Sequence, residues 1–284
     1  MTESGLIVKG VGGKCEVLIN GERYTCTPRG VFRNRGSVPL VGDHVKITIT
    51  NEAKKQGVLH TILPRKNTLR RPMVANVSQA VVTVSAANPE FNQGLMDRFL
   101  IMIEDEDIPI LVCINKKDLV SCDALELFEQ YECAGYTVVF TDTINGEGIE
   151  RLRQEMSGRI NLFAGPSGVG KSSLINALLP DLRLETGELS TKNKRGKHTT
   201  RHTELFPIGD GFLFDTPGFT SLDITHVNPE NYAYLFREFR TYLVDCKFSN
   251  CIHAGEVGCA VKEQVGKGIH PARYESYLSI ILAV

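Results

Sequence analysis

Residues 165–172 read G-P-S-G-V-G-K-S, which fits the pattern G-x-x-x-x-G-K-[ST]. Glycines let a backbone wrap around phosphate groups and turn its N–H groups toward them, while the lysine and the last hydroxyl suit the phosphates and Mg²⁺. The apolar run 160–164 predicts a strand before the loop, and residues 173–178 predict a helix after it. This context indicates an α/β nucleotide-binding domain. The predicted nucleotide-binding residues of the loop are Gly165, Pro166, Ser167, Gly168, Val169, Gly170, Lys171, Ser172 and Ser173.

A second pattern follows the strand-like run 110–114 and reads Asn115-Lys116-Lys117-Asp118. A carboxylate accepts hydrogen bonds, and guanine presents its N1–H and its N2 amine side by side, whereas adenine does not. Asp118 therefore predicts selection of GTP and GDP over adenine nucleotides. Asn115, Lys116 and Lys117 complete the predicted base-binding segment.

A third pattern, D-T-P-G, occupies residues 215–218 after the short apolar run 212–214. An acid at the end of a buried strand can hold Mg²⁺ through water, and the N–H of Gly218 can face the γ-phosphate. On its own the tetrapeptide would also fit a plain turn. It indicates a nucleotide site because the same chain contains the phosphate loop. Asp215 and Gly218 join the predicted nucleotide site, and Ser172 and Asp215 are predicted magnesium ligands.

The order of the three patterns is unusual. In most GTPases the phosphate loop comes first, then D-x-x-G and then N-K-x-D, whereas here N-K-K-D precedes both of the others. The ends of a domain commonly lie close together at its surface, so a sheet domain can be reopened elsewhere without rebuilding its core. We therefore predict a circularly permuted GTPase domain.

Strand-like and helix-like segments alternate from about residue 73 onward, which predicts a mainly parallel sheet covered by helices. The expected strands are 80–84, 110–114, 137–140 and 160–164, and the expected helices are 94–103, 124–130 and 149–156.

The N-terminal 72 residues differ in both pattern and charge. They hold 13 Lys/Arg and 5 Asp/Glu, a balance of +8 in a chain of net charge −1. Five short strand-like runs predict a small barrel of the OB type, a fold that often binds RNA or DNA. The runs are 6–11, 15–19, 22–27, 44–50 and 58–63, with the hairpin signal Asn20-Gly21 between the second and third. A structural β-domain without a ligand is the alternative.

Basic residues gather in two connections of this module. Arg29, Arg33 and Arg35 precede the fourth run, and Arg65, Lys66, Arg70 and Arg71 follow the fifth. Solvated loops would explain them, but their concentration favours contacts with the phosphates of a nucleic acid.

The residue after the D-T-P-G glycine is Phe219, where many GTPases carry the glutamine that orients the attacking water. A phenyl ring cannot hydrogen-bond water, so another group must do so. The basic stretch 192–201 occupies the place of the first switch, and Thr199 or Thr200 within it could close over Mg²⁺. His198 is the candidate for orienting the water, the alternative being one exposed polar residue in a basic loop.

A third module is marked by Cys246, Cys251, His253 and Cys259, three thiols and one imidazole within 14 residues. Cys₃His is a closed tetrahedral set for structural Zn²⁺. These four residues are therefore predicted to bind one zinc ion. The remaining five cysteines are expected to be reduced and buried, as in cytosolic proteins.

Taken together, these residues closely resemble the bacterial RsgA family, also called YjeQ or YloQ, over essentially the whole chain. The resemblance rests on the motif order, on G-P-S-G-V-G-K-S, on G-K-H-T-T at 196–200 and on the C-x4-C-x-H-x5-C spacing. It implies slow GTP hydrolysis stimulated by the 30S ribosomal subunit, binding to its 16S rRNA near the decoding region, and release of other assembly factors. It also implies that His198 is catalytic. One departure is Thr141-Asp142-Thr143, where many GTPases have Ser-Ala-Lys.

The expected architecture is multidomain. Residues 1–72 form an OB-fold RNA-binding domain, residues 73–224 a circularly permuted α/β P-loop GTPase domain, and residues 225–284 a mostly helical zinc-binding domain. No apolar run approaches the ~20 residues of a membrane span, and the N-terminus lacks the pattern of a signal peptide. A cytoplasmic monomer that does not bind membranes is expected.

Three functions remain open on the sequence. The leading one is a GTP hydrolase that assists late maturation of the 30S subunit. The second is an RNA-binding module in which GTP only orders the protein and hydrolysis is incidental, a reading that Phe219 favours. The third is a permuted GTPase for another RNA, such as tRNA.

Overall fold

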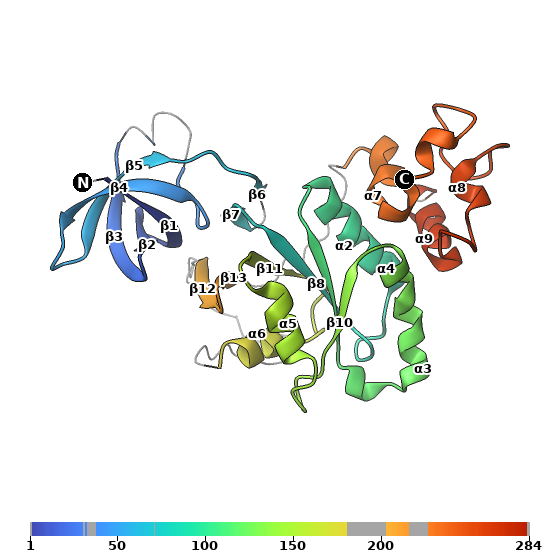
Figure 1. The fold of residues 1–284 in the computed structure, drawn as a ribbon, viewed down its shortest axis with the longest axis horizontal. Helices are drawn as coiled ribbons and strands as arrows, with labels where there is room; N and C mark the ends of the chain where they lie inside the picture. The colour runs from blue at the N-terminus through green and yellow to red at the C-terminus, as the bar shows by residue number, and fades with distance from the viewer. Residues whose placement is uncertain are drawn as a thin grey trace, which may run out of the picture. The chain divides into compact units, whose positions relative to one another are not determined.

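The computed structural model of the protein describes residues 2–30, 32, 38–70, 72–180, 203–215 and 227–282 (Figure 1). The chain divides into two compact units. The first comprises Met1–Ser78, Met156–Leu162 and Gly187–Pro217, and the second comprises Gln79–Glu155, Phe163–Thr186 and Gly218–Val284. The predicted domain boundaries at residues 72 and 224 stay predictions.

The N-terminal strands form a closed barrel, because β1 pairs with both β2 and β4 and the circuit continues through β3 and β5 (Figure 1). Alternate side chains point inward, so Val17, Ile47 and Leu59 are fully buried. The predicted OB-type barrel is confirmed. Its strands are β1 (Thr2–Val11), β2 (Lys14–Ile19), β3 (Glu22–Pro28), β4 (His44–Asn51) and β5 (Gln56–Ile62).

The hairpin between β2 and β3 turns at Asn20 and Gly21, whose φ angles are 49° and 85°. Positive φ at both central residues is the turn geometry that matches strand twist, which is why the Asn-Gly pair predicted it.

Further strands of the first unit follow the barrel in the chain, and β11 continues from the first unit into the second. Strand β11 (Ile160–Ala164) runs parallel to β13 (Gly211–Asp215), and β12 (Glu204–Ile208) lies antiparallel to β13. Lys9 of β1 is paired with Glu204 of β12. A short two-stranded sheet, β6 (Thr68–Arg70) with β7 (Met73–Ala75), follows the barrel.

The second unit contains the parallel strands β8 (Gln79–Ser85), β9 (Ile110–Asn115) and β10 (Thr137–Phe140), as predicted. Both β8 and β9 are buried along their whole length, and helix α2 (Gln93–Asp105) packs against them. The predicted helices at 149–156 and 173–178 correspond to α5 (Ile149–Met156) and α6 (Lys171–Leu178). The predicted single helix 124–130 is instead three short segments, α3 (Cys122–Leu125), η2 (Glu126–Phe128) and α4 (Glu129–Cys133).

The C-terminal segment is mostly helical, as predicted, but in short pieces. They are η3 (Pro229–Asn231), α7 (Tyr232–Leu235), η4 (Arg237–Phe239), η5 (Leu243–Asp245), α8 (Ala260–Glu263) and α9 (Pro271–Ile281). Phe236 interrupts the helical run because its backbone is extended, with φ −86° and ψ 101°. Its buried ring then stacks on Phe239 at 5.2 Å and meets Tyr277 edge-on at 5.3 Å.

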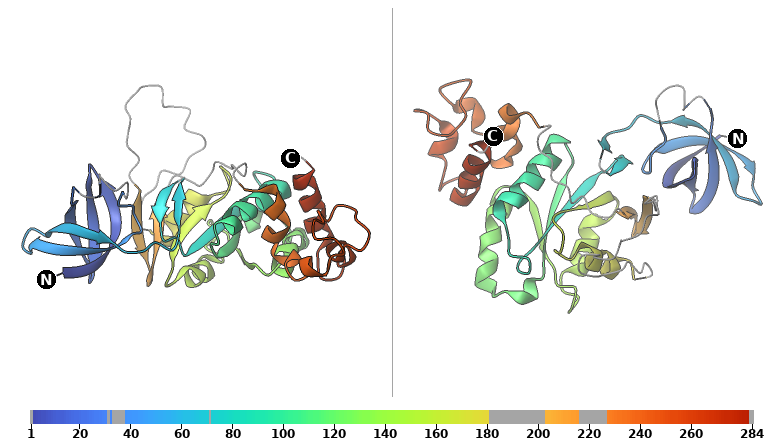
Figure 2. Two further views of the ribbon diagram at one scale, coloured as in Figure 1. Left: turned by 90° about the horizontal axis from the view of Figure 1, so that it is seen from above. Right: turned by 180° about the vertical axis from the view of Figure 1, so that it is seen from behind.

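Helix α9 lies beside α2 (Figure 2), and buried charges join them. The guanidinium of Arg273 in α9 is 1% exposed and pairs with Asp97 of α2 and with Glu238 of η4. It also lies over the ring of Tyr131 at 5.3 Å. A second acid of α2, Glu104, pairs with Arg237 and Arg240. These contacts attach the C-terminal helices to the strand-bearing part of the same unit.

The cysteines outside the C-terminal cluster are free, and Cys15, Cys26 and Cys113 are buried as expected. Cys122 and Cys133 are exposed, which corrects the expectation for these two residues. Their segment is the broken helix between β9 and β10, whose Cys-bearing positions lie outside the core. None of the helices in the described part of the chain combines the length and apolarity that a bilayer crossing requires.

Candidate nucleotide site and metal site

The glycine-rich loop connects β11 to α6, which is the strand–loop–helix context that the sequence predicted. Its lysine is folded over the loop, because the Lys171 Nζ donates to the carbonyl oxygens of Gly165 at 2.9 Å and Pro166 at 2.6 Å. Burial lowers the pKa of Lys171 to about 8. Ser167, Gly168 and Ser172 are exposed. The loop therefore presents backbone and hydroxyl groups to a ligand while its ammonium group stays within reach.

Asn115 fastens the base-binding segment to this loop. It ends β9 and is fully buried, and its Nδ2 donates to the carbonyl oxygen of Val169 at 2.9 Å. Gly170 makes this approach possible, because its φ is 94° and an added Cβ would lie 2.3 Å from that same Nδ2. Any side chain at residue 170 would displace Asn115.

Lys116 makes the second link between the two motifs. Its Nζ donates to the carbonyl oxygen of Gly168 at 2.9 Å and to that of Asn88, in the segment after β8. Two motifs that stand more than 50 positions apart in the chain are thus hydrogen-bonded to each other. The unusual order in the sequence therefore yields a single local structure, as the permutation predicted.

The other two residues of the segment lie in η1 (Lys117–Leu119). The carboxyl group of Asp118 belongs to an exposed residue, as a base-binding acceptor must. The ammonium of Lys117 pairs with Glu147 at 2.6 Å, in the loop after β10. Lys117 therefore has a protein partner in the position where the sequence predicted a nucleotide contact.

The structure describes two of the predicted magnesium ligands, Ser172 and Asp215, on separate elements. Ser172 and Ser173 open helix α6, and Asp215 ends β13 with its pKa raised by burial and by the neighbouring Glu204. His198, Thr199, Thr200, Gly218 and Phe219 lie outside the described residues.

The four predicted metal ligands converge. The ligand atoms of Cys246, Cys251, His253 and Cys259 all lie within 4.8 Å of one another. The Nδ1 of His253 is 3.5 Å from the Cys246 sulfur and 3.4 Å from the Cys259 sulfur. His253 has a left-handed backbone, with φ 59°, which turns its side chain into the cluster. The cluster could hold a metal ion.

Residues that the sequence analysis did not single out hold this loop in shape. The Glu256 carboxylate accepts the N–H groups of Ile252 at 2.7 Å, Ala254 at 3.0 Å and Gly255 at 3.0 Å. Tyr274 of α9 donates to the carbonyl oxygen of His253 at 2.7 Å. The local sequence around Glu256 does not predict that its carboxylate accepts these backbone N–H groups, because this role depends on the fold of the loop.

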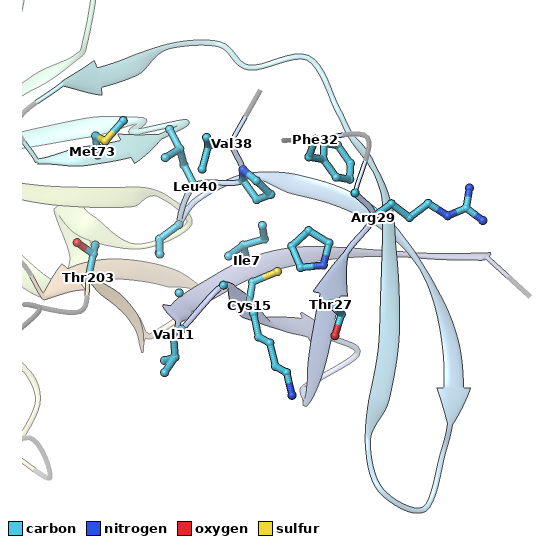
Figure 3. Close-up of a pocket in the computed structure, with 18 residues that line it drawn as sticks. Ile7, Val11, Cys15, Thr27, Arg29, Phe32, Val38, Leu40, Met73 and Thr203 are labelled. Atoms are coloured by element: carbon cyan, nitrogen blue, oxygen red, sulfur yellow. The ribbon is translucent and has the colours of Figure 1, made fainter. Parts of the chain in front are cut away.

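A separate cavity of about 660 Å³ opens in the first unit at one end of the barrel (Figure 3). Its lining is mostly apolar and includes Ile7, Val11, Phe32, Val38, Leu40 and Met73. Arg29 lies at its edge, with the guanidinium directed outward (Figure 3).

One of the basic residues predicted to contact nucleic acid has a structural partner instead. The guanidinium of Arg65 pairs with the fully buried Asp43 through two contacts of 2.6 and 2.8 Å and donates to the Val38 carbonyl. Arg29, Lys66 and Arg70 form no ion pair with any described residue. Arg33, Arg35 and Arg71 lie outside the described residues.

Comparison with known proteins agrees with this arrangement. The family model of the RsgA GTPase matches residues 62–225, and that of the RsgA N-terminal domain matches residues 4–59. The chain is 45% identical to the small ribosomal subunit biogenesis GTPase RsgA of Alkaliphilus metalliredigens, over 98% of this chain and 96% of the relative. It is equally identical, with the same coverage, to the protein of that name from Geobacillus thermodenitrificans.

Solved structures give the same result. The crystal structure of YloQ, described as a circularly permuted GTPase, superposes with a TM-score of 0.84 at 35% identity and covers 100% of this chain and 95% of that one. The crystal structure of YjeQ from Thermotoga maritima gives 0.86 at 36% identity, covering 100% and 98%. The matched models, the relatives over full length and the joined nucleotide motifs lead to one conclusion: this chain belongs to the RsgA family of circularly permuted GTPases.

Proposed function

We propose that this protein hydrolyses GTP to GDP and phosphate while bound to the small ribosomal subunit, and that it assists the biogenesis of that subunit. The observation that carries the nucleotide part is the pair of hydrogen bonds from Asn115 to Val169 and from Lys116 to Gly168. They support a single site in which Asp118 would select guanine and the glycine-rich loop would bind the phosphates. The ribosomal part is supported by the names of the full-length relatives.

The catalytic parts of the proposal rest on the sequence and the family. Ser172, Asp215 and Thr200 would hold Mg²⁺, with Thr199 as the alternative switch ligand. His198 would orient the attacking water in place of a glutamine, since Phe219 cannot. The proposed domains are residues 1–72, 73–224 and 225–284, in a cytoplasmic monomer.

The ion in the C-terminal cluster would be Zn²⁺. A tetrahedral centre with Zn–S of about 2.3 Å and Zn–N of about 2.0 Å places sulfur and nitrogen ligands roughly 3.5 Å apart. The sulfurs of Cys246 and Cys259 are 3.5 and 3.4 Å from the Nδ1 of His253. Three thiolates and one imidazole leave no position for a substrate, so the ion would be structural.

The barrel would contact 16S rRNA. Arg29, Lys66 and Arg70, which form no ion pair with a described residue, are free to meet phosphates, whereas Arg65 is committed to Asp43. The apolar cavity beside Arg29 gives the same end of the barrel a recess into which an RNA surface could fit. Because phosphate contacts release counterions, such binding would weaken steeply as salt rises.

The experiment that tests the proposal is GTP turnover with and without purified 30S subunits, with 50S subunits, tRNA and ATP as controls. Strong stimulation by 30S alone is the expected result. Equal stimulation by 50S subunits or tRNA would redirect the proposal to another RNA, and turnover of ATP would contradict the role of Asp118.

The second candidate is an RNA-binding protein that GTP merely orders, and the charge balance of +8 in residues 1–72 favours it. His198→Ala separates the two. If hydrolysis is the function, this variant binds GTP normally and loses subunit-stimulated turnover by about 10²-fold or more. Unchanged stimulated turnover removes His198 from the mechanism.

A further inference from the structure

Strand β12 begins with an acid that faces the predicted magnesium ligand of the neighbouring strand. Glu204 of β12 and Asp215 of β13 lie directly opposite each other in the antiparallel pair. Residues in this relation point to the same face of a sheet, with Cβ atoms about 4.5–5.5 Å apart, and like charges there repel each other. Asp215 forms no ion pair with any described residue that would offset this repulsion.

Two cations of the barrel hold the Glu204 carboxylate. The Nζ of Lys9 in β1 lies 2.5 Å from its Oε2, and the Nη1 of Arg23 in β3 lies 2.7 Å from its Oε1. Lys9 is also the register partner of Glu204 where β1 pairs with β12. Arg23 has a second acidic partner, Glu16, at 3.2 Å. Both oxygens of Glu204 are therefore bonded to side chains of the barrel, within the same compact unit that contains Asp215.

The charge of Glu204 acts in both directions. Its side chain is 13% exposed, so solvent screens it less than it screens a surface pair. Burial raises the pKa of the Glu204 carboxyl, but the hydrogen bonds from Lys9 and Arg23 outweigh it and the pKa is lowered overall. Burial also raises the pKa of Asp215, and the neighbouring Glu204 charge raises it further. Glu204 is therefore a carboxylate that interacts electrostatically with Asp215 on one side and with the barrel cations on the other.

A magnesium ion held by Asp215 would experience all of these charges. Glu204 contributes a negative charge that favours the ion, whereas Lys9 and Arg23 contribute positive charges that oppose it. While both ion pairs are intact, the attraction of Glu204 for the ion is largely cancelled. Removing a cation would strengthen magnesium binding, and removing Glu204 would weaken it.

We propose that Glu204 is a positioning residue beside the magnesium site, and that Lys9 and Arg23 restrain its influence, so that the barrel sets how tightly Asp215 holds Mg²⁺. The inference rests on the proposed function, in which Asp215 is a magnesium ligand. Glu204 itself does not contact the ion, because both of its oxygens are bonded to the barrel cations. It acts through the charge that it places beside Asp215.

The test is a titration of Mg²⁺ into the full-length protein with a non-hydrolysable GTP analogue, the protein being in excess so that no free nucleotide competes for the ion. A unit charge about 8 Å from a divalent ion changes its binding by about fivefold even at the dielectric constant of water. We therefore expect Lys9→Met to strengthen magnesium binding by about fivefold and Glu204→Gln to weaken it by about fivefold. Both variants break the same ion pair, so loosening of β12 alone would shift the affinity in the same direction in both.

Further variants support the interpretation of these shifts. Arg23→Met should act like Lys9→Met but more weakly, because Glu16 shares the Arg23 guanidinium. Lys9→Arg keeps the charge and should keep the wild-type affinity for Mg²⁺. Lys55→Met is the matched control, because it removes another barrel lysine that pairs with acids, Glu22 and Glu52, and it should leave that affinity unchanged.

Added salt gives a second readout, because it screens charges that are partly exposed. The shifts in Lys9→Met and Glu204→Gln should shrink as the ionic strength rises, which a loosened strand would not cause. Shifts in the same direction for the two variants, or no shift in either, would overturn the inference.

The result for wild type separates this inference from the function on which it rests. If Asp215→Ala leaves magnesium affinity at the wild-type value, the predicted magnesium site is wrong and the inference falls with it. If Asp215→Ala weakens magnesium binding but the Lys9 and Glu204 variants match wild type, only the role of Glu204 is wrong.

Discussion

The second unit contains two candidate ligand sites that are built in opposite ways. The nucleotide site sits at the ends of fully buried strands, and its motifs are joined by protein hydrogen bonds through Asn115, Lys116 and Thr141. The metal site sits in a segment of short helical turns, where four ligand atoms meet within 4.8 Å. Cys259 belongs to the apolar core of the C-terminal helices, and Cys246 and Cys251 pack against that core, whereas Val244 and Val257 beside the ligands are 85% and 80% exposed.

This contrast implies that the two sites depend to different degrees on their ligands for their structure. Hydrogen bonds between the phosphate loop and the base segment hold the nucleotide site in shape through the protein alone. Within residues 246–259 only His253 and Cys259 are buried, so the proposed ion would add to the stability that core packing and the hydrogen bonds from Tyr274 and Tyr277 of α9 supply.

The largest effect is expected from removing the metal. Binding of a structural zinc ion is worth on the order of 10 kcal/mol, so a strong chelator or Cys251→Ser should abolish amide protection throughout residues 246–259 in hydrogen exchange. GDP affinity should change by less than about threefold, because the hydrogen bonds of the nucleotide loop within the described part of the chain do not involve this segment.

Cys122→Ser is the matched control, since that thiol is exposed and outside the cluster. Loss of GDP binding in parallel with loss of the ion would show that the two sites are not independent. Full protection of residues 246–259 after chelation would show that the loop folds without metal.

The next effect concerns the buried ion pair that joins the C-terminal helices to α2. Asp97→Ala leaves the Arg273 guanidinium buried with Glu238 as its one acidic partner among the described residues. Breaking a buried pair costs about 3–5 kcal/mol, so we expect a clear fall in the thermal midpoint with exchange increasing first in α9. Arg153→Ala, which removes an exposed i,i+3 pair of α5, should leave the midpoint unchanged. Equal midpoints for the two variants would contradict the role of Asp97.

This pair also marks the limit of what the sequence predicts. The phosphate loop, the N-K-K-D segment and the Cys/His set each carry a local signature, and all three were found from it. Asp97 and Arg273 are 176 positions apart and have no local signature, so only the fold brings them together. The pairing of Arg65 with Asp43 was missed for the same reason, and the predicted phosphate contact of Arg65 stays a prediction.

Local sequence patterns also failed to predict strand β12 and the break in the C-terminal helices. Strand β12 contains Pro207, a residue depleted in strands, and its run E-L-F-P-I gives no clear alternation. The C-terminal module is helical as predicted, but Phe236 leaves the helical conformation to bury its ring in the C-terminal core. Tertiary packing overrides propensity in that segment.

A third prediction tests whether the nucleotide site depends on the contact between its two motifs. Gly170→Ala places a Cβ where the Asn115 amide now lies and adds strain at positive φ. Strain of this kind costs about 1–3 kcal/mol, and we expect GDP affinity to fall by about 10- to 100-fold in a calorimetric titration. Gly135→Ala is matched in backbone strain, with φ 85° and open space around the added Cβ, and should retain GDP affinity. Similar losses in both variants would attribute the effect to strain alone.

The smallest expected effect is a weakening of GDP binding as the pH rises. Metal binding by the Cys/His cluster should not show this dependence. Burial lowers the pKa of Lys171 from 10.5 to about 8 in the protein without nucleotide. Phosphate groups beside the Lys171 ammonium would raise its pKa again. The complex then binds more protons than free protein and free GDP together, so GDP binding weakens as the pH rises. Between pH 7.0 and 8.5 the GDP dissociation constant should increase about fourfold, as a single group of pKa near 8 loses its proton.

Calorimetry in two buffers of different ionisation enthalpy measures this proton uptake directly. Lys171→Arg keeps a permanent charge and should bind more weakly but with no pH dependence over the same range. Metal occupancy of the Cys/His cluster, followed in the same samples, should stay constant. An unchanged dissociation constant for wild type, without proton uptake, would mean that Lys171 is already fully charged before nucleotide binds, and that its contacts with Gly165 and Pro166 offset its burial.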